Sequence, residues 1–345
     1  MTLEIKVVIL FTYSIIDRLK ASLDVFCVVK MNTKSNMKKL LLAMIPVMAG
    51  LSSCGGEAPV ESEVIASDQS QFLLTKYDDG YHVDDYIGGD STIRLPAYYQ
   101  ENDGTLVPVT AISAYGLARR PQLNTVYLSP TIKFIGANAF YESSIEKLYV
   151  TPYLEDMDAE AFNGSGLSFV EKDSSYFLPT PSSDVGYLLA YSTNASLTNG
   201  VYQISIPDGC QAIYKGVFKD FVGQITLPDS IEVIGEGAFE NANIGYQADF
   251  SNVKHIGAKA FYNAQCLRYK KNGNANYTIH GYGFAFSSKL TTVGSSAFYG
   301  ASYSRTYLGV DPFKEGIIDL GHDAKPTGFA DDWNVNYSVN YLGSE

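Results

Sequence analysis

One six-residue pattern recurs seven times along the chain, in strict or relaxed form, and it constrains the fold more than any other feature. The strict copies consist of Ile or Val, Gly, two variable residues, Ala and Phe, and they span 135–140, 234–239, 256–261 and 293–298. Looser copies begin at positions 112, 157 and 213. Successive copies are separated by 23, 22, 56, 21, 22 and 37 residues. A period near 22 predicts a solenoid, because a unit of this size cannot bury its own apolar face and has to stack on its neighbours.

Residues 123–140 show what one unit is expected to do. Val126 and Leu128 alternate with polar residues, as in a strand with one buried face. Pro130 ends that strand because it has no N–H for further pairing. Gly136 suits a turn that needs a positive φ, and 137–142 is expected to form a short turn or 3-10 segment. The phenylalanine that ends each hexamer is predicted to fill the core between coils, at Phe140, Phe162, Phe218, Phe239, Phe261 and Phe298.

Four strands with the same alternation define a possible binding face. When they are aligned on their apolar pairs, two columns of outward-facing residues appear, and we expect the strands to form one continuous parallel sheet. Tyrosine offers a partner a large, stiff, amphipathic area, but tyrosines that merely pair across strands would give the same pattern, so both interpretations stay open. The columns are Tyr127, Tyr149, Ser205 and Thr226, and Thr125, Lys147, Gln203 and Gln224.

The whole unit, Leu-x-x-Ile-x-Leu-Pro-x-x-Ile-x-x-Ile-Gly-x-x-Ala-Phe, resembles the BspA-type (Treponema pallidum-type) leucine-rich repeat over about residues 82–310. The resemblance implies a mainly β repeat solenoid, with a parallel sheet on one face, short turns or 3-10 segments on the other, and β caps at both ends. It also implies a surface lipoprotein of Bacteroides-like bacteria. Departures from the pattern are interpreted as drift in single units: Leu117 for Phe, Met157 and Asp158 for Ile-Gly, and Tyr214 for Gly.

The interruptions of the period predict the domain organisation. Residues 71–111 are expected to form an N-terminal cap, because an uncovered solenoid end exposes core. The leucine-rich repeats then occupy 112–310, with insertions near 170–200 and 268–288. Residues 311–345 form the predicted C-terminal cap, in which a strand at 336–341 closes the sheet edge.

Residues 1–53 form a predicted signal region. A short basic stretch and a 12-residue apolar run, too short to span a membrane, lead to Leu51-Ser-Ser-Cys54. This resembles a bacterial lipobox, which implies that Cys54 is lipidated. The resemblance also implies that the lipid alone anchors the protein to the membrane, through its acyl chains, on the outer membrane facing the cell surface. We assign 31–53 to the lipoprotein signal and 1–30 to a start-site artefact. Residues 54–70 are a flexible tether.

Charge and composition argue against several functions. A formal net charge of -12 disfavours nucleic acid as a partner. The four histidines, including His255, show no metal-ligand spacing, and the acidic pairs at 78–79, 84–85 and 331–332 do not predict a catalytic cleft. Cys210 and Cys266 occupy apolar positions of the repeat and are expected to fill core. We therefore expect no catalytic site, no metal site and no cofactor.

The sequence thus predicts a non-enzymatic cell-envelope lipoprotein whose leucine-rich-repeat surface serves protein–protein or adhesive interaction. The alternative is a glycan-binding accessory lipoprotein in nutrient capture, which the presence of a single tryptophan, Trp333, weakens. The partner, an unknown protein or glycan, and the oligomeric state stay open. So does O-glycosylation of two Asp-Ser-Thr/Ile triplets, at 90–92 and 229–231.

Overall fold

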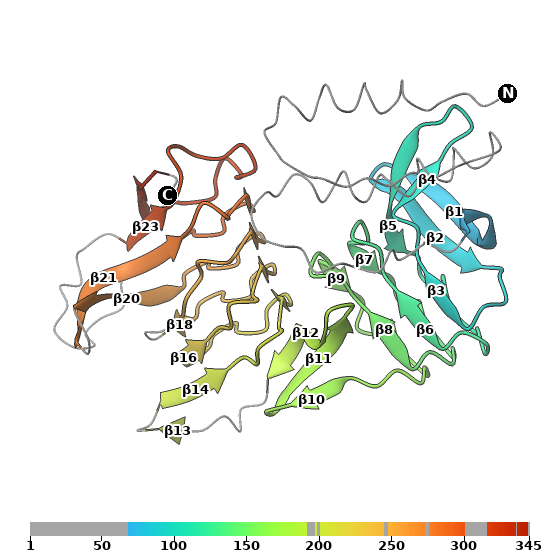
Figure 1. The fold of residues 1–345 in the computed structure, drawn as a ribbon, viewed down its shortest axis with the longest axis horizontal. Helices are drawn as coiled ribbons and strands as arrows, with labels where there is room; N and C mark the ends of the chain where they lie inside the picture. The colour runs from blue at the N-terminus through green and yellow to red at the C-terminus, as the bar shows by residue number, and fades with distance from the viewer. Residues whose placement is uncertain are drawn as a thin grey trace, which may run out of the picture. The chain divides into compact units, whose positions relative to one another are not determined.

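The computed structural model describes residues 68–191, 197–198, 201–244, 248–272, 276–300, 316–335 and 337–343 (Figure 1). The chain divides into two units, Met1–Ile65 and Ala66–Glu345, and every described residue belongs to the second. The predicted signal region, Cys54 and most of the tether lie outside the described residues. Among the described residues, no helix combines the length and the apolar character needed to cross a membrane.

The N-terminal cap is built on an antiparallel hairpin. The 3-10 helix η2 (Gln69–Gln71) leads into β1 (Phe72–Tyr77), which pairs with β2 (Gly80–Tyr86). Strand β2 pairs in parallel with β5 (Leu106–Ile112), and β4 (Tyr98–Gln100) adds to β5 in antiparallel fashion. Phe72, Val83 and Tyr86 are buried in one core cluster with Ile112 and Leu117 of the first hexamer. The hairpin therefore covers the end of the first coil.

Each coil of the first array adds one short strand to each of two parallel sheets. The strand that begins the hexamer extends the sheet β5-β7-β9, through β7 (Phe134–Ile135) and β9 (Asp156–Met157). The other strand belongs to the three-stranded sheet β3-β6-β8, formed by β3 (Thr92–Arg94), β6 (Thr125–Tyr127) and β8 (Lys147–Tyr149). Pairing is parallel because every coil runs through the same path in the same direction.

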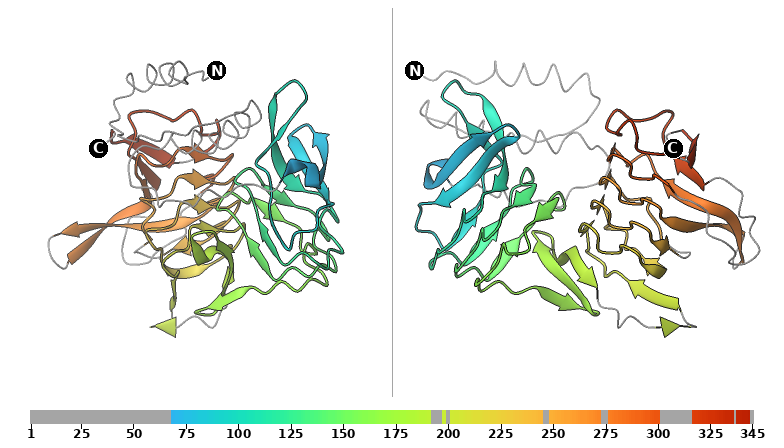
Figure 2. Two further views of the ribbon diagram at one scale, coloured as in Figure 1. Left: turned by 45° about the vertical axis from the view of Figure 1, so that its right-hand side comes forward. Right: turned by 180° about the vertical axis from the view of Figure 1, so that it is seen from behind.

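A second array begins after an antiparallel meander of β10 (Val170–Lys172), β11 (Ser175–Thr180) and β12 (Ser183–Tyr191). Strand β12 pairs in parallel with β15 (Ala212–Ile213), and β17 (Val233–Ile234), β19 (His255–Ile256) and β22 (Thr292–Val293) follow in order. The expected single continuous sheet is therefore wrong: the described strands form separate sheets before and after the meander (Figures 1 and 2).

The second array also carries the longest sheet, of eight strands, and both predicted insertions fall on hairpins. Near 268–288 the chain forms the β20–β21 hairpin, and near 170–200 it forms the meander described above. Strand β24 pairs in parallel with β23 at the end of this sheet, where the C-terminal cap was predicted. The sheet runs through β13 (Leu197–Thr198), β14 (Val201–Ser205), β16 (Val222–Thr226), β18 (Asn243–Ile244), β20 (Gln265–Asn272), β21 (Asn276–Phe286), β23 (Gly316–Leu320) and β24 (Tyr337–Tyr341).

The last four residues of each hexamer and those just after it form turns that make a third connection between coils. The phenylalanine N–H donates to the alanine carbonyl of the next coil at 2.7–2.8 Å, from Phe140 to Ala161 and from Phe239 to Ala260. In six of the seven hexamers the fourth residue adopts a positive φ, as at Asn138 and Lys259; Glu160 of the hexamer at 157–162 does not. The glycine at position two does not, contrary to expectation. Glycine is required there because a Cβ on Gly257 would lie 2.5 Å from a backbone nitrogen of the preceding coil.

The phenylalanines stack through the core of the second array. Phe218, Phe239, Phe261 and Phe298 have ring centroids 5.1–5.2 Å apart and interplanar angles of 4–11°. These four and Phe140 are fully buried, whereas Phe162, predicted as core, is only partly buried. In the C-terminal cap, Trp333 covers the last ring, edge-on to Phe298 at 5.9 Å, and Phe329 packs against Trp333.

Candidate functional site

The outer face of the sheet β3-β6-β8 carries the most regular array of exposed functional groups that the described residues offer. Its register aligns Tyr127 with Tyr149, and Thr125 with Lys147, while Val126 and Leu148 between them point into the core and are fully buried. The alternation of the two kinds of residue follows from the period of a strand. The predicted column of tyrosines is thus brought together by the fold.

The two tyrosine rings lie face to face, and an arginine extends the stack. The ring centroids of Tyr127 and Tyr149 are 4.4 Å apart with an interplanar angle of 5°. The guanidinium of Arg94, which β3 places next to Tyr127, lies 3.7 Å from the centroid of that ring. Cation–π and ring–ring contacts of this kind each contribute about 0.5–1.5 kcal/mol. We call Arg94, Tyr127 and Tyr149 the Arg-Tyr stack; all three side chains are partly exposed.

Sequence reasoning missed Arg94, although a signal for it existed. The segment Thr92 to Leu95 has the same alternation as the strand at 125–128, with Ile93 and Leu95 buried, so an alignment of the two segments would have placed Arg94 in the tyrosine column. The segment was instead assigned to the N-terminal cap as a whole.

The rest of the predicted face lies in a different sheet. Gln203 pairs with Gln224 and Ser205 with Thr226, as predicted, but on β14 and β16 of the eight-stranded sheet. The described hydrogen-bonded strand pairs do not connect this sheet to β3-β6-β8, because the meander intervenes. The eight predicted residues therefore form two separate surfaces, and the aromatic one carries the stack.

The acidic pairs are engaged in structural contacts. Asp79 accepts hydrogen bonds from Thr110 Oγ1 at 3.1 Å and contacts His82 Nε2 at 3.0 Å. Asp332 accepts from Ser295 and Ser296 at 2.7 and 2.8 Å, which lowers the pKa of its carboxyl. Among the described residues, no group of three or more His, Cys, Asp or Glu is placed to hold a metal ion.

Neither body cysteine is disposed for nucleophilic chemistry. Cys210 and Cys266 are both buried. Burial raises the pKa of the Cys210 thiol to about 12, so it is protonated at neutral pH. Both side chains pack in the core cluster of the second array, which is the role expected from their positions in the repeat.

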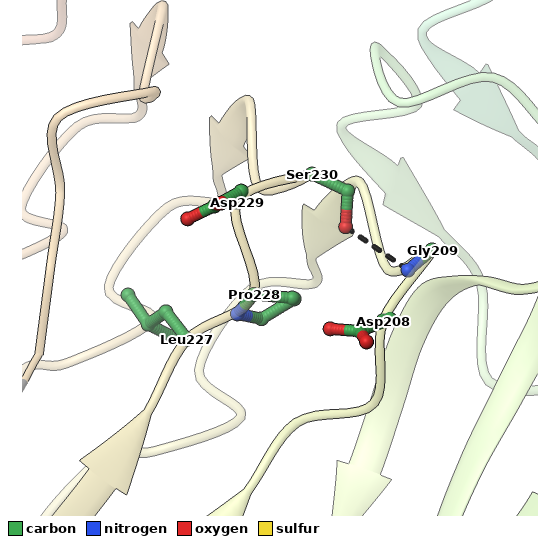
Figure 3. Close-up of a pocket in the computed structure, with 6 residues that line it drawn as sticks. All are labelled: Asp208, Gly209, Leu227, Pro228, Asp229 and Ser230. Atoms are coloured by element: carbon green, nitrogen blue, oxygen red, sulfur yellow. Dashed lines mark hydrogen bonds between the residues drawn. The ribbon is translucent and has the colours of Figure 1, made fainter.

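A surface depression between two coils of the second array offers little for chemistry. It is lined by Asp208, Gly209, Leu227, Pro228, Asp229 and Ser230 (Figure 3). The Ser230 hydroxyl donates to the carbonyl of Cys210 at 2.7 Å and accepts from the N–H of Gly209 at 3.1 Å. These bonds join adjacent coils and engage the hydroxyl of one of the two triplets considered for glycosylation, whereas Ser91 of the other triplet is exposed.

Comparison with known families decides the relationship that the repeat suggests. Residues 106–175 and 193–307 match the BspA type Leucine rich repeat region, in six copies. The chain belongs to this family.

Solved structures similar to this BspA-type repeat protein come from several bacteria. A leucine rich cell surface protein from Faecalibacterium prausnitzii is 17% identical, over 77% of this chain and 72% of that chain, with a TM-score of 0.27. The T. pallidum Leucine Rich Repeat protein is 18% identical, over 56% and 86%, with a TM-score of 0.26. A leucine-rich repeat protein from Bacteroides ovatus is 15% identical, over 81% and 71%, with a TM-score of 0.24. No curated protein matches the chain.

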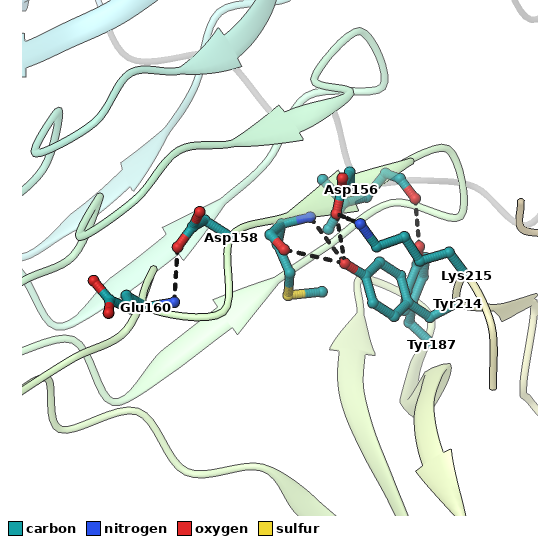
Figure 4. Close-up of polar contacts among 8 residues, drawn as sticks. Asp156, Asp158, Glu160, Tyr187, Tyr214 and Lys215 are labelled. Atoms are coloured by element: carbon teal, nitrogen blue, oxygen red, sulfur yellow. Dashed lines mark hydrogen bonds and ion pairs between the residues drawn. The ribbon is translucent and has the colours of Figure 1, made fainter.

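Two departures from the BspA-type pattern, interpreted above as drift, lie at the junction between the arrays (Figure 4). Tyr214, in place of glycine, directs its hydroxyl at the free edge of β9. That oxygen accepts the N–H of Met157 at 3.0 Å, lies 3.2 Å from the Met157 carbonyl and 2.8 Å from Asp156 Oδ1. Asp158, also in place of glycine, accepts the N–H of Glu160 at 2.8 Å. Both side chains bond backbone groups that a following strand or coil would otherwise pair, so the interpretation as drift is wrong.

An ion pair adds to this junction. Lys215 contacts Asp156, and the Tyr187 hydroxyl donates to the carbonyl of Leu154. Burial opposes ionisation of Asp156, but its bonds with Lys215 and Tyr214 outweigh burial and lower the pKa of the carboxyl. Burial raises the pKa of Tyr214 above its ordinary value, so its hydroxyl keeps its proton. The BspA-type array is thus interrupted at a defined, hydrogen-bonded junction.

Proposed function

We propose that this chain is a non-enzymatic cell-envelope lipoprotein that binds protein partners through its leucine-rich repeats and so serves adhesion. The observation that carries the proposal is the Arg-Tyr stack on the outer face of β3-β6-β8. Tyrosine and arginine are the residues that contribute most at protein interfaces, and stacking holds these side chains in place before a partner arrives, which lowers the entropy cost of binding. Membership of the BspA-type family supports the proposal.

The geometry favours protein over glycan as the partner. A sugar ring stacks on the open face of an aromatic side chain. In the stack, one face of Tyr127 lies against Arg94 and the other against Tyr149. Trp333 is 2% exposed and packs in the core, so it offers no platform either. Tyr127 therefore presents its ring edge and hydroxyl beside a cation, which suit polar and charged protein groups.

Binding to immobilised matrix proteins tests the proposal. The full chain would be assayed against fibronectin, collagen and fibrinogen, with a set of polysaccharides in parallel. Tyr127→Thr with Tyr149→Thr removes the rings but places β-branched residues, which suit strands, at both positions, and should weaken protein binding by about tenfold or more. The matched control is Tyr202→Thr, which removes an exposed tyrosine from β14. Retained binding in the double variant, or loss for polysaccharides alone, would contradict the proposal.

The location is tested separately, by protease treatment of intact cells. Surface display requires that the protein be digested without permeabilisation, and lipid anchoring requires that Cys54→Ala release it from the membrane fraction. Protection until permeabilisation would place the protein in the periplasm and remove the adhesion proposal.

A further inference from the structure

One coil of the solenoid lacks the neighbour that every other described coil has. In six of the seven hexamers, the N–H of residue six and that of residue eight, counted from the hexamer start, donate to carbonyls of the following coil or of the C-terminal cap. The acceptors for residue six are the carbonyls of Ala139, Ala161, Ala238, Ala260, Ala297 and Trp333, at 2.7–2.8 Å. The coil at 157–164 is the exception. Among the described residues, the N–H groups of Phe162 and Gly164 have no acceptor.

The phenylalanine of this coil is also incompletely covered. Phe162 stacks on Phe140 of the preceding coil, at 5.4 Å and 13°. The other described ring against Phe162 is Phe169, which lies edge-on at 6.1 Å and is 43% exposed. In the second array, by contrast, the ring of the following coil stacks on that of the preceding one, as Phe239 does on Phe218 at 5.2 Å. The coil therefore presents backbone donors and part of an aromatic face together.

The charge around this coil has one sign. Residues 155–169 contain four carboxylates and neither Lys nor Arg. Glu155 pairs with Lys133 and Asp156 with Lys215. Asp158 and Glu160 are exposed, and within the described part of the chain no lysine or arginine forms an ion pair with them. Figure 4 shows both side chains on this coil, away from the contacts of Tyr214. The two carboxylates precede the unpaired donors on the same coil.

The geometry points to the coil at 157–164 as a docking site for an extended, basic peptide that carries one aromatic side chain. The peptide would accept the Phe162 and Gly164 N–H groups with its carbonyls, stack its ring on Phe162, and place its cations near Asp158 and Glu160. It would thus take the position of the coil that is missing from the array, in the manner of strand addition. Extended backbone satisfies the donors, and the ring and the charge select among peptides.

The chain itself supplies a matched pair of probes. A synthetic peptide of residues 252–263 contains a strict hexamer with Lys254 and Lys259, and one of residues 230–241 contains a strict hexamer with Glu232, Glu236 and Glu240. Fluorescence anisotropy of the labelled peptides with the full chain would measure binding. We expect the basic peptide to bind more tightly than the acidic peptide, by about tenfold or more. It should exceed by the same factor a basic peptide that carries Phe261→Ala. Equal binding of the three peptides, or no binding of the basic one, would overturn the inference.

Two further measurements locate the site. Glu160→Lys should weaken binding of the basic peptide by about tenfold. Glu236→Lys makes the same change at an exposed position of a coil whose donors are paired, and it should leave binding unchanged. Hydrogen exchange should show the Phe162 and Gly164 amides exchanging faster than the Phe239 amide in the free chain and slowing when the peptide binds. Binding without slowing at these amides would place the peptide elsewhere and refute the site.

The inference rests on the proposed function in that both assign a protein ligand to the chain, but they use different residues. If the peptide fails to bind while Tyr127→Thr with Tyr149→Thr still abolishes matrix binding, the inference alone is wrong. If the peptide binds at Phe162 and the tyrosine variant still binds matrix proteins, the proposed role of the Arg-Tyr stack is wrong and the inference stands.

Discussion

At the scale of single residues, each fixed position of the hexamer meets a requirement that close contact between coils imposes. Gly257 is fixed by lack of space for a Cβ, Ala260 is fully buried, and Phe261 fills the core between its neighbours. The structure also shows that a residue of the same repeat position can have different surroundings. Phe162 occupies the position of Phe239 but lies at an interruption, so it is less buried.

This difference predicts unequal costs of truncation. Phe239→Ala should lower the free energy of unfolding by about 3–5 kcal/mol, because it removes a fully buried ring between two stacked rings. Phe162→Ala should cost about 1 kcal/mol, since part of that ring is already in water. Urea unfolding followed by circular dichroism measures both. Equal losses would show that the coil at 157–164 is as well covered as the others.

The hydroxyl of Tyr214 makes a second prediction at this scale. Tyr214→Phe keeps the ring but leaves the Met157 N–H on the edge of β9 without its acceptor, so stability should fall by about 1–3 kcal/mol. The control is Tyr262→Phe, whose ring stacks on Tyr299; its effect should stay within about 0.5 kcal/mol. A loss of the same size in both variants would mean that the hydroxyl of Tyr214 contributes nothing special.

At the scale of elements, strand β19 carries a histidine, His255, that links it to the neighbouring strand β22. His255 is partly buried, its Nδ1 lies 2.7 Å from Thr292 Oγ1 on β22, and its ring contacts Tyr153 edge-on at 5.3 Å. Burial first, and then Lys133 and Lys254, lower its pKa below the ordinary value of 6.5. The folded chain therefore holds this imidazole neutral at a pH where the unfolded chain already protonates it.

Stability should consequently fall as the pH is lowered from about 6.5 towards the pKa of the folded state, and change no further from this cause below it. In this window the unfolded chain binds the extra proton, which fixes the sign. His255→Gln should remove that part of the pH dependence while leaving the acid limb, to which Asp156 contributes, in place. Parallel pH profiles of unfolding for the two proteins would contradict the assignment to His255.

At the scale of the whole described chain, each array is closed at a different end by different means. The hairpin of β1 and β2 covers the first coil, and Phe329 and Trp333 cover the last. Trp333→Ala should therefore cost about 3–5 kcal/mol and act first on the second array. In the Trp333→Ala variant, amide hydrogen exchange should accelerate, relative to the unmodified chain, more at Phe298 and Phe261 than at Phe140. A uniform effect on both arrays would indicate that they unfold as one unit.

The repeat period was enough to predict the solenoid, because a solenoid follows from stacking similar units. The interruption was not predictable from the same logic. Tyr214 and Asp158 look like isolated substitutions until the missing neighbour is known, and the register that adds Arg94 to the tyrosines depends on β3 joining the sheet. Position in the period predicts burial, whereas contacts across an interruption depend on the path of the chain between the arrays.

The direction of the hydrogen bonds between coils also governs how a gene of this kind can change in length. Within the second array, the turn of each hexamer donates from the same three backbone positions to the same three positions of the next, as Phe218 does to Ala238 and Phe239 to Ala260. A duplicated or deleted unit of about 22 residues would meet identical partners on both sides. The coil with Asp158 and the one with Tyr214 are not interchangeable with such units. Recombination can therefore lengthen or shorten the second array in whole repeats, while the junction keeps its place.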